Sequence, residues 1–361
     1  MEDLTPRERF LRAMRFEPVD RLPLLHMGLW QETEQRWLAE GMTELTAELA
    51  GFDGPLQSCW LYGPYQGPIP AFEPEIINRT AQYIDQRNEL GQIERRSIGQ
   101  TSMPFFLEYP VSSRADWDGY KRRLDATSPE RYPDNWTTLV DERSTTAAGE
   151  IRGVAVWGYY GFPRQLCGPE QLSLLFYDDP DLIRDMNEYW LAFTMQRLER
   201  GLREMDFDYA LIWEDNCYNH GMLHSPAVFR EFMAPHYRTL IDFFRSHGID
   251  MISVDSDGNV TELIPLLLDV GVTAIHPLEV AAGMDVVALG REYPQLQMWG
   301  GLDKRALAID QQAIDDELAR VIPAMKARGG YAAALDHNVP PDVSLANHRY
   351  YLQRLREISQ Y

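Results

Sequence analysis

Residues 209–259 read YALIWEDNCYNHGMLHSPAVFREFMAPHYRTLIDFFRSHGIDMISVDSDGN. The stretch opens and closes with an apolar run, at 209–213 and at 249–254, as expected for two buried β-strands. Each run ends in carboxylates: Glu214 and Asp215 in the first, Asp255 and Asp257 in the second. Between the runs, Ser225-Pro226 predicts the start of a helix and His247-Gly248 predicts its end. This order is typical of parallel strands, whose carboxyl ends meet where ligands bind.

The same alternation continues along most of the chain. Apolar strand candidates begin near residues 22, 52, 151, 209, 249, 272, 296 and 330, with helical segments between them. This α/β pattern predicts a single (β/α)₈ TIM-type barrel that spans 1–361 as one domain. Residues 58–150 interrupt the rhythm and predict an N-terminal helical and hairpin elaboration, with the hairpin at 75–97. A capping box at Thr5-Pro-Arg-Glu8 predicts a helix that runs to about residue 15.

Composition narrows the class of function. The chain has 361 residues, 45% of them hydrophobic, which is enough for a large core. Acidic residues outnumber basic ones by 55 to 34, and this disfavours nucleic acid as a partner, because phosphate binding needs a basic face. No window approaches ~20 uninterrupted apolar residues, so we expect no membrane span. The charged N-terminus lacks the apolar centre of a secretory signal, so we expect a cytoplasmic protein.

Polar residues at the strand ends are the candidate site. In a barrel, residues at the carboxyl ends of the strands share one mouth. Those residues are His26, Trp157, Glu214, Asp215, Asp255, Asp257, His276, Glu279, Asp303, Asp336 and His337. Several carboxylates with a histidine form the ligand set of a divalent metal such as catalytic zinc. The three cysteines, Cys59, Cys167 and Cys217, are too widely spaced for a CxxC zinc site or a disulfide framework.

The same residues also have plain structural interpretations. Asp255 or Asp257 can cap the helix that follows, Glu279 can hold its own loop, and His26 can be a buried core histidine. Asp303 and Lys304 can form a simple ion pair. Many aromatic residues fall in loops, where they either line a pocket or pack: Trp30, Trp60, Tyr62, Tyr65, Trp157, Tyr159, Tyr160 and Phe162.

Six motifs taken together resemble the uroporphyrinogen decarboxylase superfamily. They are Leu4-Thr-Pro-Arg-Glu-Arg, Asp20-Arg-Leu-Pro23, Ser225-Pro-Ala-Val-Phe-Arg-Glu-Phe232, Asp257-Gly-Asn259, Pro277-Leu-Glu-Val-Ala-Ala-Gly-Met-Asp285 and Gly300-Gly-Leu-Asp303. The resemblance covers nearly the whole chain and implies a (β/α)₈ barrel. True decarboxylases of this kind act on a tetrapyrrole without a cofactor, and arginines in a Met-Arg-Gln-Ala-Gly-Arg run hold the substrate carboxylates. Here that position reads His26-Met-Gly-Leu-Trp-Gln31, without arginine.

The second branch of the superfamily consists of corrinoid-dependent methyltransferases. The members of this branch that methylate thiols bind zinc through a His-x-Cys motif and a later Cys. At the matching positions this chain resembles them only in part, because it carries Asp255-Ser-Asp257 and His337. What the resemblance then implies is the demethylating type, which moves a methyl group from an O- or N-methyl donor to the cobalt of a corrinoid protein. A metal ion would polarise the donor oxygen of an aromatic methyl ether.

Under this resemblance each residue has an expected role. The expected metal ligands are Glu214, Asp255, Asp257, Glu279 and His337, with zinc as the metal. The expected catalytic residues are Asp257, His337 and His220, the last as a general acid. The expected substrate contacts are His26, Trp30, Trp157, Tyr159 and Asp215. The expected partners are a small-molecule substrate, a corrinoid protein and a second copy in a homodimer.

Two other functions stay open. One is a cofactor-independent decarboxylase of a tetrapyrrole or aromatic acid, in which Asp257 or His337 would deliver a proton to the carbanion carbon. The other is a non-catalytic binding protein that has kept the barrel. Bound metal would separate the methyltransferase from the decarboxylase, and a solvent-reachable acid cluster would weigh against the binding protein.

Overall fold

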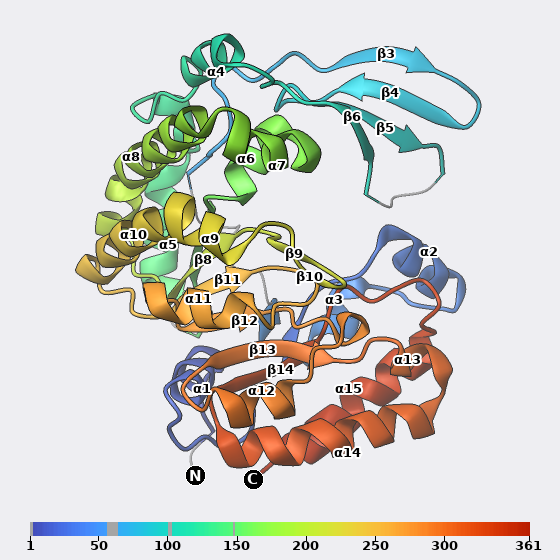
Figure 1. Cartoon of the computed structure of the whole chain (residues 1–361). Coiled ribbons are helices and arrows are strands. Elements are labelled where there is room, and N and C mark those ends of the chain that lie inside the picture. The colour runs from blue at the N-terminus through green and yellow to red at the C-terminus, as the bar shows by residue number, and fades with distance from the viewer. Residues whose placement is uncertain (1–2, 56–63, 100–102, 147–148) are drawn as a thin grey trace.

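Parallel strands form the centre of the molecule (Figure 1). The computed structural model describes residues 3–55, 64–99, 103–146 and 149–361. Six strands pair in the order β14-β13-β12-β11-β8-β7. Their bounds are β7 Gly153–Trp157, β8 Tyr209–Trp213, β11 Ile252–Asp255, β12 Ala274–His276, β13 Gln297–Leu302 and β14 Tyr331–Leu335.

Two short strands continue this order. β1 (Leu25–His26) pairs with β2 (Gly54–Pro55) in parallel, and a bridge from Leu24 to Ala333 links β1 to β14. All eight predicted strands are therefore confirmed, in the sequence of neighbours that a barrel requires. Within the described residues, no pairing joins β2 to β7, so the closed barrel stays a prediction.

Helices lie outside the strands, because every inter-strand segment except the early excursion carries an apolar helical face (Figure 1). The bounds are α1 Pro6–Met14, α2 Gln31–Ala39, α3 Leu45–Leu49, α4 Arg114–Lys121, α5 Trp136–Thr146, α6 Gly161–Cys167, α7 Pro169–Asp178, α8 Pro180–Glu204, α9 Pro226–Val228, α10 Ala234–Ser246, α11 Leu263–Val270, α12 Val286–Glu292, α13 Ala306–Ile309, α14 Gln311–Arg328 and α15 Leu345–Ser359. The helix predicted after Ser225 is present, but a π-helical turn at Phe229–Met233 divides it. The sequence did not predict α3, α5, α6 and α13.

The predicted capping box begins α1, where the Thr5 and Glu8 side chains each accept from the other's backbone N–H. The buried face of α1 closes the amino end of the strands. The Phe10 ring lies 6.1 Å from that of Tyr209 and 5.9 Å from that of Trp299. The inner core beside them includes four alanines, from β7, β12 and β14. Small inward residues leave room for these large rings, so the interior is packed.

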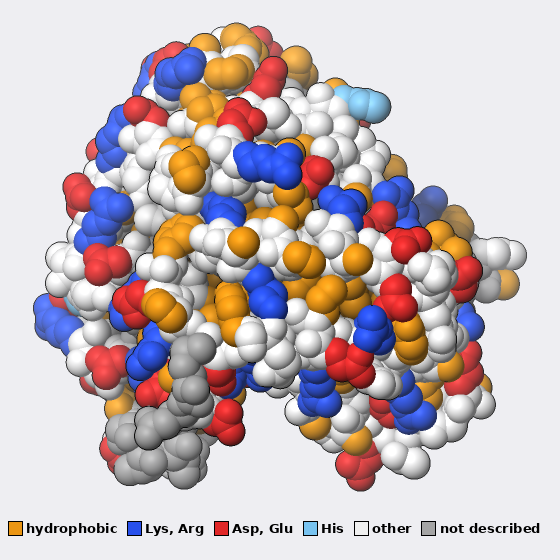
Figure 2. Space-filling model, turned by 90° about the horizontal axis from the view of Figure 1, so that it is seen from below, with side chains coloured by type: hydrophobic (Ala, Val, Ile, Leu, Met, Phe, Trp, Pro, Cys, Tyr) orange, Lys and Arg blue, Asp and Glu red, His pale blue; other side chains and the backbone are white. Residues whose placement is uncertain are grey.

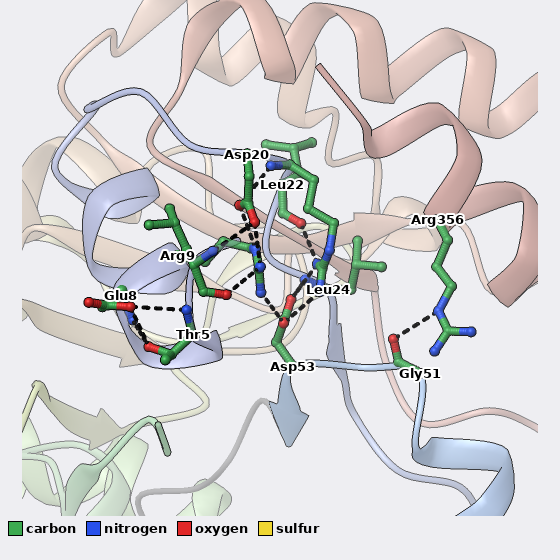
Figure 3. A network of polar contacts seen from close by, with 11 residues as sticks. Thr5, Glu8, Arg9, Asp20, Leu22, Leu24, Gly51, Asp53 and Arg356 are labelled. Atoms are coloured by element: carbon green, nitrogen blue, oxygen red, sulfur yellow. Dashed lines mark hydrogen bonds and ion pairs between the residues drawn. The ribbon is translucent and has the colours of Figure 1, made fainter. Parts of the chain in front are cut away.

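An ionic network ties the N-terminal segment to β1 and β2 (Figure 3). The buried Arg9 guanidinium donates to Asp20 through Nε at 2.8 Å and to Asp53 through Nη1 at 2.7 Å. Asp53 also accepts from Arg21 and from the backbone N–H of Leu24. These contacts give the Asp20-Arg-Leu-Pro23 motif a structural role.

The excursion before β7 contains an antiparallel sheet in the order β3-β4-β5-β6. Its strands are β3 Glu75–Arg79, β4 Tyr83–Arg87, β5 Ile93–Ser97 and β6 Phe105–Glu108. The predicted hairpin at 75–97 is confirmed and grows to four strands. Figure 1 shows this sheet projecting from the body on the side away from the two chain ends.

No helix in the described part of the chain is long and apolar enough to cross a membrane. Figure 2 shows the face seen from below, where acidic and basic side chains are interspersed with apolar ones.

Candidate functional site

The carboxyl ends of β8, β11, β12, β13 and β14 meet at one edge, which we call the mouth. Strand register sets this arrangement, since Asp255 pairs with Trp213 on one side and with His276 on the other. Side chains alternate between the inner and outer face of a strand. Tyr209 and Leu211 belong to the inner core, and Ile212 belongs to the outer one. Alternation therefore separates the carboxylates that the sequence groups together.

Glu214 lies on the outer side, fully buried. Its carboxylate accepts from the backbone N–H groups of Tyr159, Tyr160 and Gly161 at 2.8, 2.8 and 2.6 Å, and from the Tyr237 hydroxyl at 2.6 Å. Burial raises the pKa of Glu214, and these four donors oppose the rise. Four hydrogen bonds occupy both oxygens, so Glu214 holds the start of α6 against α10. Tyr159 is buried in the same contact, with 1% of its surface exposed.

Asp257 and His337 come together at the mouth, from the ends of β11 and β14. Asp257 Oδ2 lies 3.6 Å from His337 Nε2, and the side chains are 40% and 24% exposed. The Trp30 ring stacks on the His337 ring, with 6.0 Å between centroids and 17° between planes. Interaction with the Asp257 carboxylate raises the pKa of His337 above its usual value, although burial opposes this. The pair is therefore an acid that solvent and a small molecule can reach.

A second carboxylate–histidine pair lies deeper. Asp255 Oδ2 is 3.7 Å from His276 Nε2, and His276 Nδ1 is 3.0 Å from Ser253 Oγ. His276 is fully buried, and burial lowers its pKa to about 3, so its ring is neutral at pH 7. Burial and the neighbouring carboxylates of Asp215 and Asp257 raise the pKa of Asp255 well above its usual range.

Two non-glycine residues at the mouth have left-handed backbone angles, Asp215 with φ 51° and Leu278 with φ 64°. Such strain costs of the order of 1 kcal/mol per residue and clusters at functional sites. Asp215 is held by Arg164, whose Nη2 lies 2.7 Å from Oδ2 and whose guanidinium covers the Trp213 ring at 5.0 Å.

Glu279, Lys304 and Asp336 form the far side of the mouth. Lys304 Nζ lies 3.3 Å from Asp336 Oδ1 and 3.7 Å from Glu279 Oε1. Glu279 also accepts from the backbone N–H of Gly258 at 3.0 Å. Asp303 forms its ion pair with Arg305, not with Lys304 as the sequence suggested. The sequence contained one overlooked indication that Lys304 belongs to the site. It is one of only three lysines, and all the other residues counted as basic are arginines.

The family model for uroporphyrinogen decarboxylase matches residues 165–358, more than half of the chain. The chain belongs to the uroporphyrinogen decarboxylase family. A solved methyltransferase from Methanosarcina mazei is similar at 16% identity and a TM-score of 0.62, over 98% of this chain and 99% of that one. This likeness shows a shared fold.

A B12-independent methionine synthase from Shewanella sp. W3-18-1 is similar at 10% identity and a TM-score of 0.31, over 94% of this chain and 97% of that one. No curated protein matches the chain in sequence.

The expected metal ligands of this family member do not converge. Within the described residues, no group of three His, Cys, Asp or Glu side chains could hold a metal ion. The donors form separate pairs instead, and Glu214 is bound on the outer side of the wall. Cys167 and Cys217 are buried, and burial raises both pKa values to about 12, so neither is a ready thiolate ligand. Cys59 lies outside the described residues.

Three further expected site residues, His26, His220 and Trp157, have other neighbours. His26 faces Phe52, with 5.5 Å between ring centroids, and burial lowers its pKa to about 4. His220 is exposed in the turn between β9 (Cys217–Tyr218) and β10 (Gly221–Met222), at the rim. These positions do not favour the substrate contact predicted for His26.

Trp157 lines a cavity of about 510 Å³ beside the end of β7. The other lining residues are Pro64, Tyr65, Gln66, Gly67, Leu90, Glu130, Arg131, Pro133 and Ala155. Tyr65 is thus one expected aromatic residue that does line a cavity, whereas Tyr160 and Phe162 are buried in the core. Trp60 and Tyr62 lie outside the described residues.

Proposed function

We propose that this protein is an enzyme that transfers a methyl group from a small methylated donor to a corrinoid carried by a partner protein. The observation that carries the proposal is the Asp257–His337 pair, which is accessible at the mouth and covered on one side by Trp30. Membership of the decarboxylase family supports an enzyme, and the fold likeness to a methyltransferase is compatible with this branch. The proposal includes closure of the eight strands into one barrel.

The chemistry of the donor decides what the site must supply. When a methyl group leaves oxygen, both electrons of the broken bond stay on that oxygen, which then needs a proton or a Lewis acid. His337, held by Asp257, is placed to give the proton. The reduced corrinoid supplies the nucleophile that takes the methyl group. Zinc was expected as the Lewis acid, but the described donors do not fit it, so no step passes through a metal.

A decarboxylase is the second candidate, because the matching family model is that of a decarboxylase. The same pair could protonate the carbanion left by loss of carbon dioxide. The charge of the mouth opposes this alternative, since carboxylates from β8, β11 and β12 would repel a substrate that carries several carboxylates. The first strand also lacks the arginines that would offset that repulsion.

The test is direct methyl transfer to free cob(I)alamin by the purified full-length protein. Aryl methyl ethers and methylated ammonium compounds would be offered in turn, and formation of methylcobalamin followed by visible absorbance. Asp257→Asn should lower transfer from both classes of donor, and His337→Gln should lose transfer from the aryl ethers. Asp316→Asn, an exposed charge change on α14, should change neither. Metal content by plasma mass spectrometry would accompany each sample.

Release of carbon dioxide from an aromatic acid or uroporphyrinogen, with no methyl transfer from any donor, would replace the proposal by the decarboxylase. Absence of both reactions would leave the binding-protein interpretation.

A further inference from the structure

The formal charges at the mouth do not cancel. Five carboxylates and two basic side chains meet there: Asp215, Asp255, Asp257, Glu279 and Asp336, with Arg164 and Lys304. Because the raised pKa of Asp255 favours its neutral form, four carboxylates against two basic side chains leave an excess of two negative charges, or one when His337 is protonated. Charges a few ångströms apart interact more strongly at a partly buried site than in water, so this excess attracts a cation.

A buried polar atom points into the same cluster. His276 Nε2 is fully buried, has no hydrogen-bond partner and faces Asp255 at 3.7 Å. Nearly all buried polar atoms in proteins are hydrogen-bonded, and an exception needs a reason. The neighbour of His276, Asp255, is one of the five carboxylates of that cluster. The unbalanced charge and the unsatisfied imidazole are separate observations about one place.

The spacing of the donors favours an organic cation over a metal ion. Zinc needs three or four donors at about 2.0–2.3 Å, and here the carboxylates and imidazoles are held in separate pairs at 3.6 and 3.7 Å. An alkylammonium ion makes no coordinate bonds. It is bound by the field of nearby carboxylates and by aromatic faces within about 6 Å. Trp30, stacked on His337 beside Asp257, offers such an aromatic ring.

We propose that the methyl donor is a small quaternary ammonium ion, bound beside Asp257 and Trp30. This inference rests on the proposed function and names its substrate class. The C–N bond breaks with both electrons on nitrogen, so the leaving group is a neutral tertiary amine. The methyl group passes to the reduced corrinoid of the partner protein, which provides the electron pair for the new bond. A neutral amine leaves without a proton or a Lewis acid, which agrees with a mouth that lacks a three-donor metal site among its described residues.

Calorimetry with a pair of isosteres tests the inference without turnover. Choline and 3,3-dimethylbutan-1-ol have the same shape, but only choline carries a positive charge. We expect choline to bind the full-length protein at least about tenfold more tightly than the neutral alcohol. Asp257→Asn should weaken choline binding about tenfold and leave the alcohol unchanged. Trp30→Leu, a second variant that keeps the charges, should also weaken choline binding, and Asp316→Asn should match the wild type.

Equal binding of the two isosteres, or choline binding unaffected by both Asp257→Asn and Trp30→Leu, would overturn the inference. Near-stoichiometric zinc that is lost in Asp257→Asn and that excludes choline would also overturn it, in favour of a metal site. Failures of the two proposals can be told apart. Selective choline binding without methyl transfer from any donor would refute the methyltransferase and the donor role, and would leave only the ammonium-binding site. Transfer from aryl ethers without choline binding would refute only the ammonium donor.

Discussion

Glu214 and Asp215 are consecutive in the chain, yet their carboxylates lie on opposite sides of the strand wall. Glu214 accepts four hydrogen bonds from α6, its preceding turn and α10. Asp215 turns to the mouth, where its φ of 51° and its ion pair with Arg164 hold it close to Asp257. One residue of alternation thus divides a carboxylate that is bound within the wall from one that faces the mouth.

Glu214→Ala should lower the free energy of unfolding by about 3 kcal/mol or more. Three buried backbone N–H groups and the Tyr237 hydroxyl would lose their acceptor, and each unsatisfied donor costs about 1–3 kcal/mol before relaxation. Urea unfolding would measure the change as a lower midpoint at constant slope. The exposed Glu73→Ala is the control and should stay within about 0.5 kcal/mol of the wild type. A fully stable Glu214→Ala protein would show that Glu214 does not hold α6.

Much of the fold could be predicted because its signals are local. Apolar runs bounded by turns marked all eight strands, and the Thr5 capping box marked α1. The helix α6 was missed because its start has no side-chain cap of its own. Its first N–H group, that of Gly161, donates to Glu214, which lies 53 residues later in the chain. Such a distant partner leaves no local pattern in the sequence.

The candidate site could be predicted only in part. Strand ends indicated Asp257 and His337 correctly as neighbours, because carboxyl ends of parallel strands share an edge. The prediction that Glu214 lies beside Asp257 and His337 ignored the alternation of side chains along a strand, although that alternation can be seen in the sequence. The partners of Lys304 depend on β12, β13 and β14 meeting in space, so the adjacent Asp303 was a misleading choice.

Acid should destabilise the protein partly through Asp20. Burial alone would raise the pKa of Asp20, but hydrogen bonds from Arg9 and two backbone N–H groups outweigh it and lower the pKa well below 3.8. A lowered folded-state pKa gives stability that is present above the unfolded value and lost as pH falls below it. Asp20→Asn should therefore be about 2 kcal/mol less stable at pH 7, and its difference from wild type should shrink below about pH 4.

Chemical unfolding at a series of pH values between neutral and acid would measure this. If the free energies of unfolding of wild type and Asp20→Asn changed in parallel with pH, the role assigned to Asp20 would be wrong. The exposed Asp316→Asn is the control, because it also removes one negative charge.

His337→Gln should affect donors according to their leaving group. Loss of a general acid typically costs 10²–10⁴-fold, so transfer from an aryl methyl ether should fall by about that factor. Transfer from a quaternary ammonium ion should change by less than about tenfold, because its amine leaves without a proton. Initial rates with cob(I)alamin and both donors would be compared in one preparation. An equal loss with both donors would indicate that His337 acts only by shaping the mouth.

Gly258→Ala should be more damaging than Gly248→Ala, although both glycines have left-handed backbone angles of similar size, φ 84° and 81°. Each substitution carries the same backbone cost of about 1–2 kcal/mol. At Gly248 an added methyl meets nothing within 4 Å, whereas at Gly258 it would come within 2.7 Å of the Tyr218 carbonyl. Backbone cannot move aside as a flexible side chain does, so the hairpin of β9 and β10 must shift away from the loop that carries Asp257.

We therefore expect Gly258→Ala to cost about 2 kcal/mol more in unfolding free energy than Gly248→Ala. Its methyl-transfer rate should also fall, because Gly258 donates to Glu279 and follows Asp257 directly in the chain. Paired urea curves and rates would measure both effects. Equal stability of the two variants would mean that the Tyr218 backbone yields easily, and the hairpin would then have no part in placing Asp257.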